Sequence, residues 1–396
     1  MTGNARSVIA AVCAAMLIDS LLYSLVVPVL PGYAARLGAS QAEIGVLFAS
    51  YAVGLVVATP VLGRLSDRFG RRRPMLAGSA GLAASTVLYA FADSYALLLT
   101  ARFAQGVAAA AVWTAGVALV ADLVPAERLG RSMGLVMGAM SVGLILGPPL
   151  GGFLEQYGDH RTPFLAVVAA TVVGAVIQAV LIRDGARRVA VASVRSLLRD
   201  RSLRGVVVAV ALGSSALSML EPILPLALAD RYGATPAVIG IVFGAATLAN
   251  GAASPVIGFA ADRCHRVRLM ALGLVLSGGL LPMLLLPGGP VGTGAVLVAF
   301  AVAYGFVLVP ALPELAAVAE RHGGGAYATV FAVFNLSYCV GMVVGPTAGG
   351  AGAQVSLPAT LAVTGALLCF SGLLLLTRIT VTPEPRPTAR QKGSSQ

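Results

Sequence analysis

The chain has 396 residues, of which 58% are hydrophobic and only 11% charged, and its mean hydropathy is +0.90. Soluble domains carry about 25% charged residues, so this composition excludes an ordinary water-soluble fold, and the apolar content excludes a disordered chain. A net charge of +11 would indicate nucleic-acid binding only as a basic face on a soluble body, so no nucleic-acid partner is expected. The four cysteines lack metal-ligand spacing and are expected to pack as small hydrophobic residues.

Read in chain order, the sequence contains twelve apolar runs of the length that a membrane-spanning helix needs, about 20 residues. These runs predict an all-α integral membrane protein. The first is too long for a cleaved signal peptide. The predicted spans are residues 8–31, 43–65, 74–93, 97–121, 133–154, 163–183, 205–229, 238–260, 269–287, 291–318, 327–350 and 357–377.

The arginines predict how the chain is oriented. With a cytoplasmic N-terminus, 23 of the 27 basic residues fall in inside loops or the tail, three fall outside, and Arg102 lies within a span. Because cytoplasmic loops of membrane proteins are enriched in Lys and Arg, both termini are expected to be cytoplasmic. The near absence of lysine and the abundance of Ala and Gly indicate a GC-rich bacterial genome, and hence the inner (plasma) membrane.

The second half of the chain repeats the first in sequence. A shift of 195 residues aligns Gly45 with Gly240, Pro60 with Pro255 and Asp67-Arg68 with Asp262-Arg263, and a shift of 198 aligns Gly147-Pro148 with Gly345-Pro346. An even number of spans in each half gives both halves the same orientation, a plan in which the substrate site lies between them. The predicted organisation is a six-helix bundle over 1–183, a basic cytoplasmic linker over 184–204, a second six-helix bundle over 205–378 and a disordered cytoplasmic tail over 379–396.

Three segments resemble signature motifs of the major facilitator superfamily. They are the loop Gly63 to Arg73, the sequence RFAQG at 102–106 and the sequence GLILGPPLGG at 143–152. The last is similar to the fifth-span motif of antiporters in that superfamily, and its candidate residues are Gly143, Gly147, Pro148, Pro149, Gly151 and Gly152. The resemblance implies twelve transmembrane helices in two pseudo-symmetric six-helix bundles. It also implies transport that needs no cofactor because a proton gradient drives it.

A narrower resemblance links the chain to the vesicular monoamine and acetylcholine transporter branch. It rests on the sequences LID at 17–19, GVLFAS at 45–50 and MLEPILP at 219–225. The chain departs from that branch at Tyr51, where the monoamine members have a lysine, and at Asn335, where they have an aspartate. It also lacks their long loop between the first two spans. The resemblance implies exchange of an organic cation or amphipathic drug for protons.

Three acidic residues, Asp19, Glu221 and Glu314, lie inside apolar runs. A charge at the bilayer centre costs about 2.5–3.5 kcal/mol, so each needs a partner, a water-filled cavity or a proton. Asp19 is expected to face a central cavity and pair with a cationic substrate. The alternative is a protonated Asp19 that is hydrogen-bonded to a neighbouring helix.

Glu221 is followed by Pro222 and Pro225, which remove backbone donors and create a polar site in the helix. The alternative is a kinked packing helix with Glu221 reaching outward. Glu314 is a candidate proton carrier, or else an inner-gate acid paired with a cytoplasmic arginine. Arg102 is expected to take part in coupling, or else to satisfy backbone carbonyls of a broken helix. Asp19, Glu221, Glu314 and Arg102 are therefore the proton-coupling candidates.

The substrate-binding candidates beyond the acids are Phe48, Tyr51, Asn335 and Tyr338, with Tyr23, Asn250, Tyr304 and Phe334 as further side chains inside spans. Aromatic rings attract cations, although most rings in a helix bundle serve packing. The gating candidates form a predicted latch at the cytoplasmic helix ends; simple cytoplasmic anchoring is the alternative. They are Gly63, Asp67, Arg68, Gly70, Arg71, Asp262 and Arg263.

The function predicted from these features is proton-coupled antiport that exports organic cations, amines or amphipathic drugs by alternating access. The protein is expected to act as a monomer in the lipid bilayer. One alternative is a proton-coupled carrier of a neutral small metabolite, in uptake or export, with Glu314 alone as the coupling acid. A remote alternative is a membrane sensor that transports nothing. An enzyme is not expected, because the sequence has no HExxH, GxSxG or P-loop motif.

Overall fold

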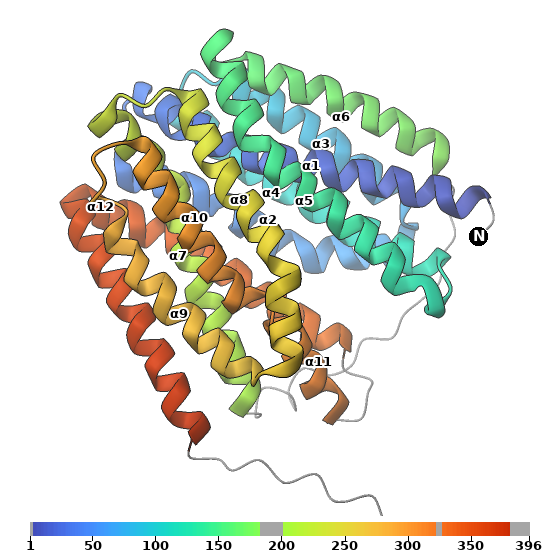
Figure 1. The fold of residues 1–396 in the computed structure, drawn as a ribbon. Helices are drawn as coiled ribbons and strands as arrows, with labels where there is room; N and C mark the ends of the chain where they lie inside the picture. The colour runs from blue at the N-terminus through green and yellow to red at the C-terminus, as the bar shows by residue number, and fades with distance from the viewer. Residues whose placement is uncertain (1–2, 183–200, 322–326, 381–396) are drawn as a thin grey trace, which may run out of the picture.

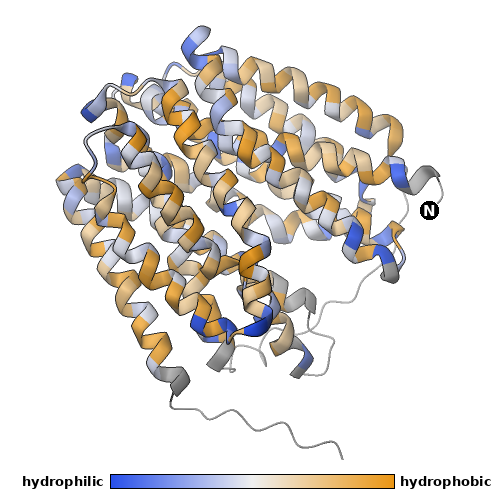
Figure 2. Ribbon diagram, in the orientation of Figure 1, coloured by the Kyte–Doolittle hydropathy of each residue, from blue (hydrophilic) through white to orange (hydrophobic). Residues whose placement is uncertain are grey.

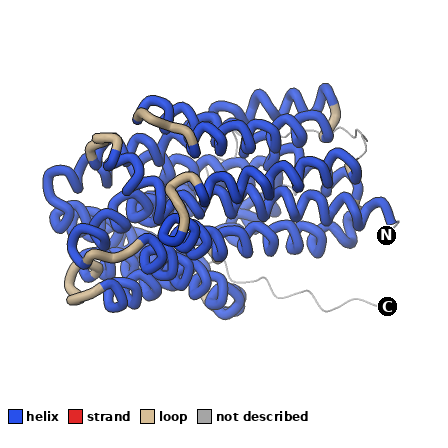
Figure 3. The backbone as a smooth tube through the Cα atoms, turned by 90° about the horizontal axis from the view of Figure 1, so that it is seen from above, coloured by secondary structure: helices blue, strands red, loops and turns tan. Residues whose placement is uncertain are grey.

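In the computed structural model of the protein, residues 3–182, 201–321 and 327–380 are described, and within these ranges the chain forms helices and short connections with no strand. Most of the predicted linker and nearly all of the predicted tail lie outside the described residues. Figure 1 shows the helices of the first half, coloured blue to green, beside those of the second half, coloured yellow to red. Figure 3 shows the short loops that join the helices.

The helices follow the predicted order. Those of the first half are α1 (Gly3–Arg36), α2 (Gln41–Phe69), α3 (Arg72–Ala90), α4 (Tyr95–Leu123), α5 (Ala126–Tyr157) and α6 (Thr162–Leu181). Those of the second half are α7 (Arg201–Tyr232), α8 (Pro236–Arg263), α9 (Arg266–Met283), α10 (Pro290–Leu308), α11 (Ala311–Arg321) and α12 (Tyr327–Thr380).

Ten of the described stretches are long and apolar enough to cross a membrane. Helix α3 is not in this set, because it is less apolar than the others: it begins with two arginines and several of its residues are Ser, Thr or Gly. Helix α12 counts once, yet its backbone is non-helical at Ser356, which lies between the predicted eleventh and twelfth spans. The predicted all-α membrane fold is therefore confirmed, whereas the count of twelve crossings stays a prediction.

The predicted tenth span, 291–318, is interrupted in the structure. Helix α10 ends at Leu308 and α11 begins at Ala311. Pro310 lies at this break and Pro313 follows within α11, and a proline cannot donate the backbone hydrogen bond that a continuous helix needs. The structure therefore divides one predicted helix into two within a single apolar stretch.

Each half packs around its own first helix. Helix α1 packs against α5 and α6, while α2 packs against α4; in the second half α7 packs against α12 and α8 against α10. The two halves meet mainly where α2 contacts α12 and where α5 contacts α8. The large exposed side chains on the outer helices are apolar, as Val176 and Val180 of α6 and Phe370 of α12 illustrate. Hydrophilic colours gather toward the helix ends in Figure 2, as expected for a bilayer-embedded protein.

The two halves use the same small-residue packing. Ser24 donates a hydrogen bond to the Gly143 carbonyl oxygen at 3.2 Å and another to that of Ser20 at 2.9 Å. In the second half Ser218 donates to the carbonyl oxygens of Gly341, at 3.1 Å, and of Ser214, at 2.7 Å. The internal repeat seen in the sequence is thus also a repeat of contacts between α1 and α5 and between α7 and α12.

Candidate functional site

The antiporter-like segment of α5 packs directly on α1. A Cβ atom added at Gly147 would lie 2.8 Å from the Leu21 carbonyl oxygen, and one at Gly151 would lie 2.5 Å from that of Leu25. Gly143 meets the same face of α1 one turn earlier, where its Cβ would lie 2.9 Å from the Leu21 nitrogen. Only glycine allows such an approach of two helix backbones. The contact holds α1, and with it Asp19, close against α5.

The remaining motif residues of α5 face the second half. A Cβ at Gly240 of α8 would lie 3.0 Å from the Pro148 carbonyl carbon and 3.2 Å from the Cα of Pro149. A Cβ at Gly152 would lie 2.8 Å from the carbonyl carbon of Pro236. This one segment therefore packs on α1 with one face and closes the contact between the halves with the other.

The second half makes the matching contact on α2. A Cβ at Gly45 would lie 3.0 Å from the Pro346 carbonyl carbon and 3.2 Å from the Cα of Gly350. Gly45 and Gly240 are partners in the sequence repeat, and so are Pro148 and Pro346, at the two shifts found above. Both contacts lie toward the helix ends opposite the arginine-rich loops, so the halves touch closely on that side.

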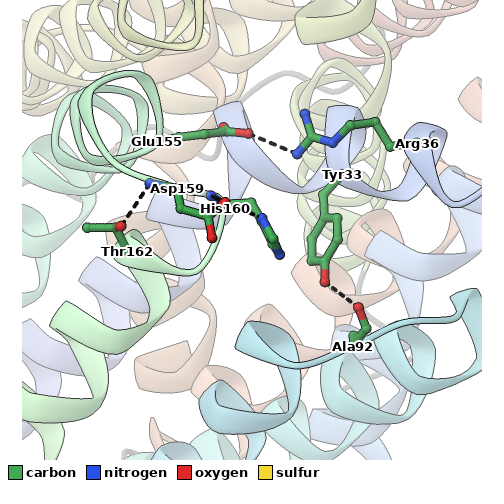
Figure 4. A network of polar contacts seen from close by, with 7 residues as sticks. All are labelled: Tyr33, Arg36, Ala92, Glu155, Asp159, His160 and Thr162. Atoms are coloured by element: carbon green, nitrogen blue, oxygen red, sulfur yellow. Dashed lines mark hydrogen bonds and ion pairs between the residues drawn. The ribbon is translucent and has the colours of Figure 1, made fainter.

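Polar contacts also tie the first half together at this end (Figure 4). Arg36 of α1 forms an ion pair with Glu155 of α5 at 3.2 Å, and Tyr33 donates a hydrogen bond to the Ala92 carbonyl oxygen. The His160 ring lies 5.0 Å from the Tyr33 ring, centroid to centroid. Three connections, after α1, α3 and α5, are thereby fixed against one another. His160 lies in the connection between α5 and α6.

The predicted substrate acid of the second half forms a hydrogen bond with the first half. Tyr23 of α1 donates its hydroxyl hydrogen toward Glu221 of α7, with both carboxylate oxygens 3.1 Å away. Asp19 lies one turn before Tyr23 on the same face of α1 and is only 7% exposed. Its Oδ1 atom is buried and has no hydrogen-bond partner within the part of the chain that the structure describes. The two acids therefore belong to one buried polar region between α1 and α7.

Arg102 of α4 lies at the centre of this region and is 1% exposed. The carbon atom at the centre of its guanidinium group lies 5.3 Å from the Tyr23 ring centroid, 5.2 Å from that of Phe48 and 4.9 Å from that of Tyr51. We call these three rings the aromatic cage. A desolvated cation–π contact contributes about 2 kcal/mol, so the three rings together give substantial stabilisation to the buried guanidinium.

Gln105 orients the guanidinium group of Arg102 through a hydrogen bond. Arg102 donates to Gln105 Oε1 at 2.8 Å, and Tyr89 of α3 donates to the same oxygen at 3.0 Å. Among the described residues its guanidinium contacts Gln105 and the three rings and no backbone carbonyl, while its role in coupling stays a prediction. Gln105 and Tyr89 were not predicted, although Gln105 belongs to the RFAQG segment and lies one turn after Arg102 on the same helix face.

Glycines explain why α4 brings Arg102 so close to the rings of α2. A Cβ at Gly106 would lie 2.9 Å from the Tyr51 carbonyl carbon, and one at Gly54 would lie 2.5 Å from the Phe103 carbonyl oxygen. Both positions therefore require glycine for the two backbones to cross at this distance. The RFAQG segment thus supplies the cation, the side chain that orients it and the small residue that admits it.

The second half completes the region with tyrosines. Tyr304 of α10 is 4% exposed and Tyr338 of α12 is half-buried. Both lie close enough to Glu221 for an electrostatic interaction with its carboxylate. Asn250 of α8 donates to the Ala301 carbonyl oxygen at 2.6 Å, which commits its amide to helix packing. Asn335 lies half-buried one turn before Tyr338 on α12. The predicted residues Asp19, Glu221, Phe48, Tyr51 and Tyr338 are therefore gathered around Tyr23 and Arg102.

Glu314 lies outside the region around Tyr23 and Arg102, on α11. Its Oε2 atom is 4.0 Å from Nη1 of Arg266 at the start of α9, and Arg266 also donates to the Pro313 carbonyl oxygen at 3.2 Å. This is the arginine-rich side of the molecule. The geometry supports the inner-gate alternative for Glu314 over the proton-carrier hypothesis.

One residue of the predicted cytoplasmic latch, Arg71, contacts the end of α4. Arg71 is buried and donates to Asp122 Oδ2 at 3.1 Å and to the Ser66 hydroxyl at 3.1 Å. Gly70 has a φ of +84°, which allows the turn between α2 and α3. The partner acid, Asp122 at the end of α4, was not singled out in the sequence because it resembles any other acid at a span end.

The other latch candidates make weaker contacts. Arg68 lies over the adjacent Phe69 ring at 5.4 Å, Arg263 lies over Phe259 at 3.8 Å, and Asp262 is exposed. Gly63 has open space around its Cα, and the side chain of Asp67 lies outside the described part.

Asp122→Asn is expected to lower the stability of the first half by about 3 kcal/mol, because it leaves a buried arginine without its counter-charge. Thermal unfolding of the purified protein, followed by tryptophan fluorescence, measures the loss. Asp262→Asn is the matched control, because that acid is exposed, and it should unfold within a degree of wild type. Equal unfolding temperatures for the two variants would show that the Arg71–Asp122 pair has no such role.

The observations define a helical membrane protein of two repeated halves, with a buried region of acids, rings and one arginine between them. The sequence model of the Major Facilitator Superfamily matches this chain over residues 12–209 and 206–396. The chain belongs to this superfamily, a family of membrane transporters and not of enzymes.

Several curated relatives transport amines or acetylcholine according to their names. The chain is 28% identical over 343 residues to the synaptic vesicular amine transporter of Rattus norvegicus, a match that covers 83% of this chain and 66% of the relative. It is 28% identical over 363 residues to a probable vesicular acetylcholine transporter-B of Danio rerio, covering 87% and 73%. The match with the amine transporter therefore spans slightly less than two thirds of its length.

A solved structure confirms the fold. The inward-facing, occupied crystal structure of a bacterial homologue of the human lysosomal transporter Spinster superposes with a TM-score of 0.84 at 14% identity, covering 96% of this chain and 98% of that one. Together these comparisons confirm the predicted superfamily and the resemblance to the vesicular transporters.

Proposed function

We propose that the protein is a proton-coupled antiporter that moves organic cations across the membrane by alternating access. The observation that carries this proposal is the pair of carboxylates, Asp19 buried and Glu221 half-buried, at the contact between the halves. Within the described residues neither Asp19 nor Glu221 forms an ion pair at 4.0 Å or less, and Arg102, whose charge acts on Glu221, is held by aromatic rings. A carboxylate at this depth needs a cation or a proton.

The mechanism is competition for these two acids. A substrate cation neutralises them in the loaded state, and protons neutralise them in the empty state, so binding of one releases the other. The close contacts of Gly45 with Pro346 and of Gly240 with Pro148 keep the pathway shut on one side while the other side exchanges ligands. The proton gradient is the driving force, and no cofactor takes part.

The topology proposed for this function has both termini in the cytoplasm and the protein acting as a monomer in a bacterial inner membrane. The arginine-rich loops are then cytoplasmic, and the closed contacts between the halves lie on the outer side. The alternative of a neutral-metabolite carrier coupled by Glu314 alone has less support, because Glu314 lies beside Arg266 at the arginine-rich end.

Transport in proteoliposomes tests the proposal. Purified protein is reconstituted, a pH gradient is imposed with the interior acidic, and uptake of radiolabelled 2-phenylethylamine is compared with that of its neutral analogue 2-phenylethanol. The expected result is accumulation of the amine well above that in protein-free liposomes under the same gradient, lost when a protonophore removes the gradient, with no accumulation of the alcohol. Gradient-driven accumulation of both compounds, or of neither, would contradict the proposal.

A further inference from the structure

Arg102 occupies the aromatic cage in the way that a bound ligand would. Three rings from two helices, Tyr23 of α1 and Phe48 and Tyr51 of α2, surround its guanidinium group at 4.9–5.3 Å. Tyr23 and Tyr51 also contact each other, with ring centroids 5.0 Å apart and planes tilted by 49°. Rings at such distances form a site for a single positive charge.

The hydrogen bonds of Arg102 leave the guanidinium incompletely satisfied. A guanidinium group has five N–H donors. Arg102 donates to Gln105 at 2.8 Å and also interacts with the Tyr89 hydroxyl, while its buried Nε atom has no partner in the part of the chain that is described. No acid within the described ranges forms an ion pair with it at 4.0 Å or less, although the charge of Glu221 acts on it from a greater distance. Arg102 is therefore held by the rings, Gln105 and Tyr89 without a direct carboxylate partner.

The cage adjoins the acids that attract a substrate cation. The Tyr23 ring forms one wall of the cage, while its hydroxyl group donates to Glu221 at 3.1 Å. Tyr51 forms another wall and lies close enough to Asp19 for an electrostatic interaction with its carboxylate. A positive charge in the cage is thus placed near Glu221, with Asp19 beside the Tyr51 wall, and two positive charges there would repel each other strongly in a low-dielectric site.

We propose that Arg102 is a tethered cation that fills the substrate's own binding cage in the empty carrier, and that an organic monocation binds by taking its place. This inference rests on the proposed function and names the part of the site that selects the charge. The ligand class is a compact organic monocation, an ammonium or guanidinium group on an apolar body. Dications are excluded because the cage accepts one charge.

Equilibrium binding of radiolabelled 2-phenylethylamine to purified protein tests the exchange. Arg102→Gln removes the tethered competitor and its repulsion, so binding is expected to tighten about tenfold. Arg102→Lys keeps a tethered cation and is expected to bind within about twofold of wild type. Tyr51→Leu removes one wall of the cage and is expected to weaken binding about tenfold. Arg72→Gln, at the contact between α3 and α6, removes an equal charge elsewhere and should leave the affinity unchanged.

The outcomes separate this inference from the proposed function. Weaker or unchanged binding by Arg102→Gln, with normal binding by wild type, would overturn the tethered-cation proposal and leave cation transport standing. Absence of amine binding by wild type and by every variant would overturn both. Should Arg102→Gln unfold, the Lys and Leu variants still decide: tenfold tighter binding by Arg102→Lys, or unchanged binding by Tyr51→Leu, contradicts a shared cage.

Discussion

Replacement of both acids of the site, Asp19→Asn with Glu221→Gln, is expected to reduce proton-driven uptake of 2-phenylethylamine to the background of empty liposomes. Removing one partner of a buried charge pair costs about 3 kcal/mol, or roughly a hundredfold in affinity, and here both partners of the cation are lost. The amide side chains keep nearly the same shape, so the helices retain their packing. Each single variant is expected to lose most of the uptake as well, because the two acids serve one cation.

Asp230→Asn is the matched control for these variants. Asp230 lies on α7, the same helix as Glu221, but is exposed near its C-terminal end. It should transport at the wild-type rate. If the double variant took up the amine at the wild-type rate, the two acids would take no part in transport.

Gly240→Leu is expected to separate the two halves on their closed side. A Cβ atom at this position would overlap the Pro148 carbonyl oxygen, and no side-chain rotation relieves a clash with backbone. Overpacking of this kind costs about 1–3 kcal/mol, enough to shift a balanced two-state equilibrium up to about a hundredfold. The packing within each half does not involve this contact, so the protein should fold and favour the opposite facing state. Gly45→Leu should act in the same way at the contact with Pro346.

Distances between spin labels measure this opening. Cysteines at Tyr157 on α5 and Val291 on α10 carry the labels, since these side chains are 78% and 84% exposed, in a chain whose own four cysteines are replaced. The distance distribution should move to longer values in Gly240→Leu. Gly138→Leu is the control on α5, because nothing lies within 4 Å of its Cβ position. An unchanged distribution in folded Gly240→Leu would refute the role of this contact.

The sequence predicted the fold and the types of residue in the site for physical reasons. Long apolar runs and the placement of arginines identify a membrane bundle without any tertiary information. Asp19, Glu221 and Arg102 were singled out because a charge inside an apolar run costs free energy unless it has a partner, water or a proton. Gly143, Gly147 and Gly151 were singled out by their resemblance to the antiporter motif, and the structure places all three against α1.

The partners of these residues could not be predicted, because they come from distant parts of the chain. Tyr23 and Glu221 are 198 residues apart, and no local pattern pairs them. The cage around Arg102 combines α1, α2 and α4, and each ring alone looked like ordinary packing. For Glu314 the sequence left both a proton carrier and an inner-gate acid open, because its neighbour Arg266 comes from a distant part of the chain. The repeat relating Gly45 to Gly240 was visible in the sequence, but its meaning required the contacts with Pro346 and Pro148.

The most direct measurement of the central claim is the number of protons released when a cation binds. Titration calorimetry of 2-phenylethylamine into the purified protein, repeated in buffers of different ionisation enthalpy, gives this number from the slope of the binding enthalpy. Competition at Asp19 and Glu221 predicts release of about one proton or more per cation near neutral pH, and none from the Asp19→Asn, Glu221→Gln variant. Binding of the cation to wild type with no proton release would contradict the claim that proton and substrate share these acids.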